Sequence, residues 1–171
     1  WLNKTYGKFF NSPKLKGSHF VSRRRCTEKL AKKKILSPSP TFNCVGPGAV
    51  GTGTLAGMRI LNLLKNKTKI WPFDELNFST KSVLVEIFPS YYFRLSKIKP
   101  EKKIGYTLEN INKSLVFFKS KPLPKKQIIG GPDQDDADSI ISSAALRFLS
   151  NDKKNWNVPN SSKKEGWIFG V

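Results

Sequence analysis

A carboxylate stands inside an apolar segment of this chain. Glu86 lies within the run 83–88, whose other members are all apolar and which Pro89 ends. A run of this length and composition indicates a buried central strand, where a carboxylate is costly unless a cation compensates its charge. Because such carboxylates hold hard cations in phosphoryl-transfer sites, we predict Glu86 as a metal ligand. The alternative is an exposed Glu86 in a salt bridge.

Four aspartates form a dense acidic cluster in an otherwise basic sequence: Asp133, Asp135, Asp136 and Asp138. Asp135 and Asp138 are spaced to project from the same side of the helix that is expected to begin there. We expect them to hold one or two Mg²⁺ or Mn²⁺ ions together with Glu86. All three are then metal ligands and catalytic residues of phosphodiester hydrolysis by metal-activated water. The alternative is helix capping and complementation of the helix dipole.

A glycine-rich loop, Gly46-x-Gly48-x-x-Gly51, matches the dinucleotide-binding fingerprint, and Asp74 follows the next expected strand. Glycines in this order also permit a tight turn and a close approach of helix to strand without any ligand. The chain after Asp74 does not repeat a nucleotide-binding unit. We therefore predict a backbone turn here and keep a dinucleotide enzyme as an alternative.

The balance of charge favours a polyanionic partner. The chain has 171 residues, with 31 Lys or Arg against 12 Asp or Glu and a formal net charge of +19. Nucleic acid is the expected partner, bound through a basic cluster of six residues: Arg23, Arg24, Arg25, Lys32, Lys33 and Lys34. Because 25 of the basic residues are lysines, contacts to the phosphate backbone are favoured over readout of bases. A lysine-rich composition without function is the alternative.

Other classes of chemistry find little support. His19 has no Cys or Glu at ligand spacing, and no Ser lies in a Gly-x-Ser-x-Gly elbow. Cys26 and Cys44 form no CxxC pair, so a zinc ribbon is excluded and a reducing compartment is favoured. No apolar run is long enough for a membrane helix and no secretory signal opens the sequence. These features predict a soluble, cytoplasmic protein without a membrane partner.

Strands and helices are expected to alternate and to position these residues. Strands are predicted at 41–45, 69–73, 83–88 and 166–171, helices from Thr54, over 106–118 and over 137–149, and a loop at 121–131. This order favours an α/β fold. We predict one domain over 1–171, with a basic irregular segment at 1–40 and an α/β core at 41–171. The sequence opens at Trp1, so it is interpreted as a fragment that lacks its amino-terminal part.

Several motifs in the same order resemble the uncharacterised "domain of unknown function 429" family, over most of the chain. They are 25–28 (RCTE), 46–51, 54–59 (TLAGMR), 71–74 (WPFD), 85–89 (VEIFP), the aspartate-rich helix start and 165–171 (EGWIFGV). The resemblance implies an RNase H-like mixed sheet flanked by helices, a divalent metal and nuclease activity. It places Glu86 at the acid of the central strand and Asp138, with Asp135 one turn before it, at the acid of the carboxy-terminal helix. The first-strand aspartate of such folds has no counterpart here.

Overall fold

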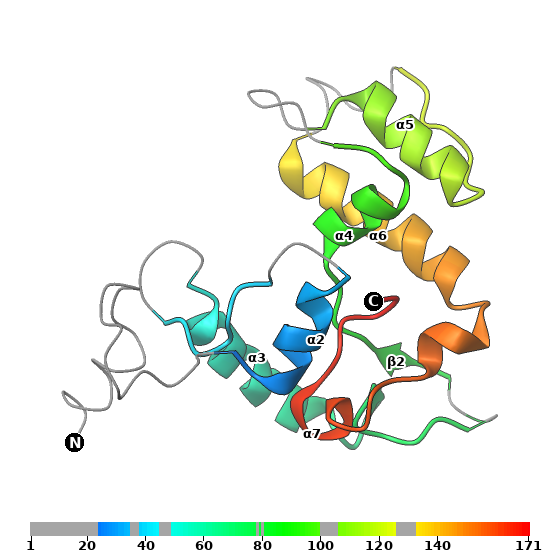
Figure 1. Ribbon diagram of the computed structural model, residues 1–171. Coiled ribbons are helices and arrows are strands. Elements are labelled where there is room, and N and C mark those ends of the chain that lie inside the picture. Colours follow the sequence, from blue (N-terminus) through cyan, green and yellow to red (C-terminus); the bar gives the residue numbers. More distant parts are fainter. Residues whose placement is uncertain are drawn as a thin grey trace, which may run out of the picture. The chain divides into compact units, whose positions relative to one another are not determined.

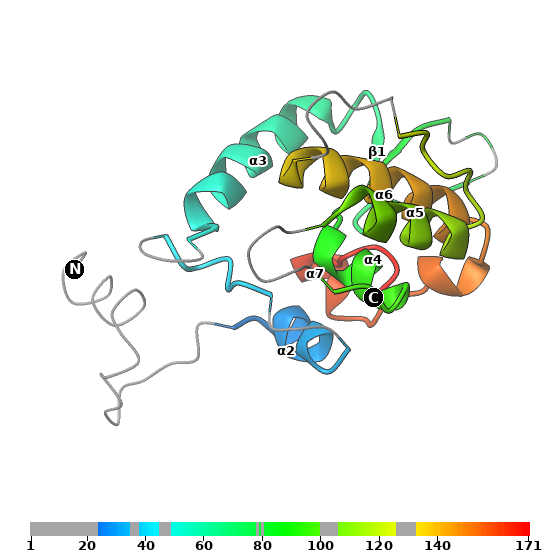
Figure 2. The ribbon, with the colours of Figure 1, turned by 90° about the horizontal axis from the view of Figure 1, so that it is seen from above.

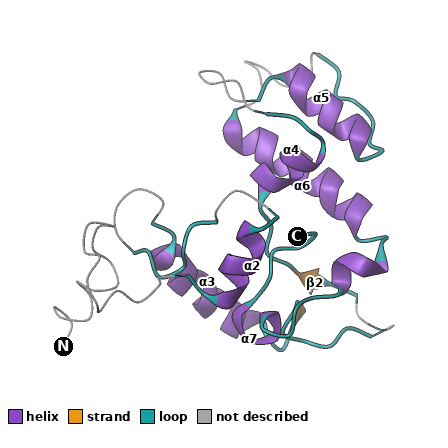
Figure 3. Ribbon diagram, in the orientation of Figure 1, coloured by secondary structure: helices purple, strands orange, loops and turns teal. Residues whose placement is uncertain are grey.

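The computed structural model describes residues 24–34, 38–44, 49–77, 79, 81–99, 106–125 and 133–171. The chain divides into two compact units. Unit 1 comprises Trp1–Val85 with Pro159–Trp167, and unit 2 comprises Glu86–Val158 with Ile168–Val171. Helices make up most of the regular structure in the described part of both units, as Figures 1 and 3 show.

Unit 1 holds α2 (Cys26–Lys32), α3 (Gly51–Leu64), β1 (Lys69–Ile70), β2 (Val83–Leu84) and α7 (Ser162–Glu165). The two strands pair in parallel, as an α/β fold requires, and they form a two-stranded sheet among the described residues. The segment at 41–44, predicted as the start of a strand, is a turn and a loop, and Val45 lies outside the described residues. The prediction that the protein contains both helices and strands is thus confirmed.

The predicted buried central strand at 83–88 is wrong. Only Val83 and Leu84 are in the β2 strand, both are half-buried, and β1 is the strand that pairs with them in the described part of the chain. Glu86 and Ile87, further along, are exposed. An apolar run identifies a segment that favours burial, but it does not supply the strands on both sides that would bury it.

The helix α3 begins at Gly51, three residues before the predicted start at Thr54. Its leucines are less buried than the helical spacing predicted. Leu61 and Leu64 are half-buried, whereas Leu55 and Met58 are exposed. The spacing therefore identified the helix correctly and overestimated how much of its apolar face is covered.

In unit 2, α4 (Pro89–Leu95) and α5 (Leu108–Phe117) pack against α6 (Gln134–Leu149). Both Figure 1 and Figure 2 show this arrangement. The predicted helix at 106–118 is confirmed as α5, which Thr107 caps by accepting a hydrogen bond from the Asn110 backbone N–H at 3.3 Å. Ile111, Leu115 and Phe118 are buried, as the periodicity predicted. The core of this unit is therefore largely helical.

The helix α4 was not predicted, although it supplies several buried aromatic side chains. Tyr92 and Phe93 are fully buried, and Tyr106 stacks on Phe93 with a centroid distance of 3.5 Å. The Tyr92 hydroxyl donates a hydrogen bond to the Phe169 carbonyl at 3.0 Å. A short 3₁₀ helix, η1 (Lys153–Trp156), follows α6. The predicted strand at 166–171 is reduced to one parallel bridge, between Ile168 and Glu86.

None of the helices in the described part of the chain combines the length and the apolar character that crossing a bilayer requires.

Candidate functional site

The backbone of Glu86 is paired with the carboxy-terminal segment. Its carbonyl accepts a hydrogen bond from the Phe169 backbone N–H at 2.9 Å, within the bridge that Glu86 forms with Ile168. Its side chain is exposed. An exposed carboxylate keeps its hydration, so its charge needs no metal ion to compensate for burial. The burial argument for Glu86 as a metal ligand was therefore wrong, and its catalytic role stays a prediction.

The acidic cluster at the start of α6 largely caps the helix. Asp133 accepts a hydrogen bond from the Asp136 backbone N–H at 2.8 Å, and Asp136 accepts one from the Asp133 backbone N–H at 3.4 Å. This reciprocal pair is a capping box and explains why α6 begins at Gln134, three residues before the prediction. The alternative interpretation of the cluster as a helix cap is thus confirmed for Asp133 and Asp136.

Asp138 is the most perturbed carboxylate of the cluster. It is half-buried, and this burial raises the pKa of its carboxyl group. A hydrogen bond from Gln134 at 2.9 Å lowers the pKa, the negative charge of Asp135 raises it, and the net shift is upward. Asp135 itself is exposed. The two aspartates therefore interact electrostatically.

The three predicted metal ligands lie in unit 2 but do not form one metal-binding group. Two of these carboxylates act on buried tyrosines, whose pKa values are raised mainly by burial. The charge of Glu86 raises the pKa of Tyr92 further, and the charge of Asp138 raises that of Tyr106 further. Among the described residues, no three His, Cys, Asp or Glu side chains gather closely enough to hold a metal ion. The site for Mg²⁺ or Mn²⁺ therefore stays a prediction.

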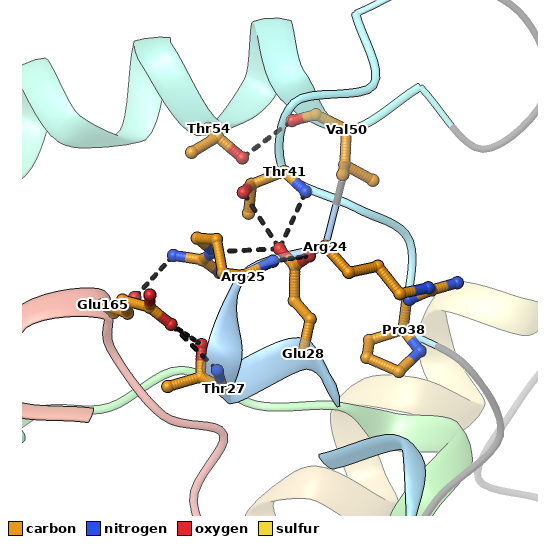
Figure 4. A network of polar contacts seen from close by, with 9 residues as sticks. All are labelled: Arg24, Arg25, Thr27, Glu28, Pro38, Thr41, Val50, Thr54 and Glu165. Atoms are coloured by element: carbon orange, nitrogen blue, oxygen red, sulfur yellow. Dashed lines mark hydrogen bonds and ion pairs between the residues drawn. The ribbon is translucent and has the colours of Figure 1, made fainter. Parts of the chain in front are cut away.

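Two of the predicted nucleic-acid-binding arginines make contacts inside unit 1, as Figure 4 shows. Arg25 forms an ion pair with Glu28 at 2.9 Å and donates a second hydrogen bond to the Glu165 carbonyl. Arg24 donates to the Pro38 carbonyl. Arg23 lies outside the described residues. Arg25 therefore has a structural role that the count of basic residues did not indicate.

Glu28 is the centre of this polar network. Only 4% of Glu28 is exposed. Its carboxylate accepts a hydrogen bond from the backbone N–H of Arg25 at 3.0 Å. It also accepts hydrogen bonds from the backbone N–H and the hydroxyl of Thr41, both at 2.9 Å. Burial raises its pKa, but the hydrogen bonds from Thr41 and Arg25 outweigh burial and lower it. Glu165 accepts two hydrogen bonds from Thr27 in the same way. The network thus fastens α2 to α7 and to the loop at 38–44.

The remaining predicted nucleic-acid-binding residues are accessible. Lys32 ends α2, and Lys33 and Lys34 follow it in a turn whose backbone N–H groups bond to the carbonyls of Leu30 and Ala31. All three lysines are exposed. Consecutive ammonium groups on a hydrogen-bonded turn form a concentrated positive charge that faces solvent.

The glycine loop is described in part, because Gly46 and Gly48 lie outside the described residues. Gly51 opens α3 and donates its N–H to the Asn43 carbonyl at 2.8 Å. A Cβ atom at Gly51 would lie 2.8 Å from the Thr41 carbonyl oxygen and would also overlap the Cys44 sulfur. Asp74, the proposed ribose ligand, accepts a hydrogen bond from the Ile70 backbone N–H at 2.8 Å. Both residues thus have local structural roles, as expected for a turn.

Replacing Gly51 with alanine should destabilise the protein by about 1–3 kcal/mol, because the added methyl group meets backbone atoms that cannot move easily. Gly57, further along α3, is the matched control. A Cβ there meets nothing within 4 Å, so Gly57→Ala should stabilise the helix by about 0.5–1 kcal/mol. Urea unfolding of both variants measures the difference. Effects of the same sign would contradict the assigned role of Gly51.

The sequence interpretation missed a basic group in unit 1. Lys65, Lys67, Lys69 and Lys81 line a pocket of about 640 Å³ beside the amino-terminal ends of β1 and β2. The signal was present in the segment 65–69 (KNKTK), in which every second residue is a lysine. Residues 65–67 form the turn that follows α3, and Lys69 opens β1.

No protein-family model matches the chain, and comparisons with curated proteins and with solved structures return no match either. The resemblance to the "domain of unknown function 429" family therefore stays a prediction that rests on its quoted motifs.

Proposed function

We propose that this protein binds nucleic acid through its phosphate backbone, with the exposed lysines Lys32, Lys33 and Lys34 as a principal contact. The observation that carries the proposal is the exposure of these three consecutive lysines in a chain with a net charge of +19. Each lysine that meets a phosphate releases a condensed counterion, and this release drives association.

Lysine chemistry supports binding to the backbone over recognition of particular bases. An ammonium group is a compact point charge, whereas bidentate contacts to guanine or phosphate need the planar guanidinium of arginine. Arg25, which the sequence offered for such contacts, is paired with Glu28 and Glu165. The proposed binding therefore has little dependence on base sequence.

The RNase H-like sheet and the metal-dependent nuclease remain predictions from the resemblance. Nuclease activity needs carboxylates that converge on a cation, and Glu86, Asp135 and Asp138 do not form such a group in the described part of the chain. A dinucleotide enzyme has less support, since Asp74 is engaged in a local turn. Binding to the backbone needs no metal ion, so it is the proposal that fits the observed groups.

Replacing Lys32, Lys33 and Lys34 together with glutamine should weaken binding to a random-sequence duplex and lower the slope of log affinity against log salt by about 3. The matched control replaces three other exposed lysines, Lys121, Lys153 and Lys154, and should change the slope less. Fluorescence anisotropy in EDTA measures binding free of metal-dependent cleavage. Equal slopes for the two triple variants would contradict the assigned contact.

A further inference from the structure

The parallel pairing of β1 and β2 brings two lysines together from distant positions. Lys69 is paired with Val83 in the register of the sheet. Just before the two strands, the Thr68 hydroxyl donates a hydrogen bond to the Ser82 carbonyl at 3.0 Å. Lys67 and Lys81 precede these two residues, and both line one pocket.

Like charges that line one pocket repel one another unless a counterion neutralises them. Lys65 and Lys69 line the same pocket as Lys67 and Lys81, and all four lysines are exposed. The described residues that line the pocket include no Asp or Glu. The charge that would balance the four ammonium groups is therefore expected from a bound anion.

The uncharged lining of the pocket also suits an anion. Hydroxyl and amide side chains surround the lysines, from Asn66, Thr68, Asn77, Ser79 and Ser82. Ser79 is held to Asn77, because it donates hydrogen bonds from its hydroxyl and its backbone N–H to the Asn77 side chain at 2.7 and 3.1 Å. A volume of about 640 Å³ is ample for a phosphate group with an attached sugar.

We propose that this lysine pocket, formed by Lys65, Lys67, Lys69 and Lys81, binds two phosphate groups of the nucleic-acid backbone. The inference rests on the proposed function and adds a second contact to the one at the end of α2. Lysine ammonium groups bind phosphate as point charges, and hydroxyl and amide groups supply neutral hydrogen bonds to its oxygens.

The test replaces Lys67 and Lys81 with glutamine in the full chain and measures affinity for a random-sequence duplex at several salt concentrations. The matched control is Lys153→Gln with Lys154→Gln, which removes the same charge from the exposed helix η1. The pocket variant should lose about tenfold more affinity than the control, and its salt slope should fall by about 2. Equal losses in the two variants, with a wild-type protein that binds the duplex, would overturn the pocket and leave the proposed function standing.

A second measurement keeps the pocket testable if the wild-type protein does not bind nucleic acid. Inorganic pyrophosphate is titrated into the ¹⁵N-labelled full chain, and the backbone amide signals of Thr68, Ser79 and Ser82 are followed by NMR. Saturable shifts that the Lys67→Gln, Lys81→Gln variant loses would support a phosphate site taking a free phosphate compound. Absence of saturable shifts would overturn it.

Discussion

Replacing Glu28 with alanine should lower the free energy of unfolding by about 3 kcal/mol, the scale expected when one partner of a buried ion pair is removed. The substitution leaves the Arg25 guanidinium without its carboxylate and removes the acceptor for both donors of Thr41. Equilibrium unfolding in urea, followed by tryptophan fluorescence, measures the change.

The matched control for this substitution is Glu109→Ala. Glu109 pairs with Lys113 at 2.7 Å on the surface of α5, where both side chains are more than half exposed. Water and salt screen such a pair, so its loss should leave the unfolding midpoint near that of the wild-type protein. A Glu28→Ala variant as stable as the Glu109→Ala variant would contradict the structural role of the network.

The contribution of Glu28 should also depend on pH. The pKa of Glu28 in the folded protein lies below its ordinary value of 4.5, so ionisation of this group favours the folded state. This stabilisation is present above about pH 4.5 and is lost as the pH falls through the folded-state pKa. The stability difference between the wild-type protein and Glu28→Gln should therefore be largest near neutral pH and shrink in acid.

Local pattern was sufficient to predict two helices of unit 2, α5 and α6. The spacing of Ile111, Leu115 and Phe118 identified α5, and the aspartates before Ala137 identified the start of α6. Both features depend on residues within a few positions of one another, which the sequence displays directly. The helix α4 was missed because Tyr91, Tyr92 and Phe93 are consecutive and all buried, which removes the helical alternation of polar and apolar residues.

The candidate sites depend on contacts that local pattern does not contain. The exposure of Glu86 follows from the small number of strands beside it, which its own apolar neighbours do not reveal. Lys67 and Lys81 line one pocket beside the paired strands β1 and β2, which are distant in sequence. For Arg25 a local signal existed, because Glu28 stands three residues later on the same helical face.

The central claim is that the protein binds the phosphate backbone of nucleic acid through lysines, and its largest expected effect is a steep dependence on salt. Each phosphate contact contributes about 0.9 to the slope of log affinity against log salt on duplex DNA. Between 50 and 200 mM salt, three contacts at the end of α2 predict a loss of about 40-fold, and two more in the lysine pocket raise it to about 500-fold.

The most direct measurement is therefore a salt series with the wild-type protein and a random-sequence duplex, recorded by fluorescence anisotropy in EDTA from about 50 to 200 mM salt. We predict a straight line on logarithmic axes, with an affinity that falls at least tenfold and that differs little between duplexes of different sequence. Failure to bind at the lowest salt concentration, or an affinity that does not change with salt, would contradict the account.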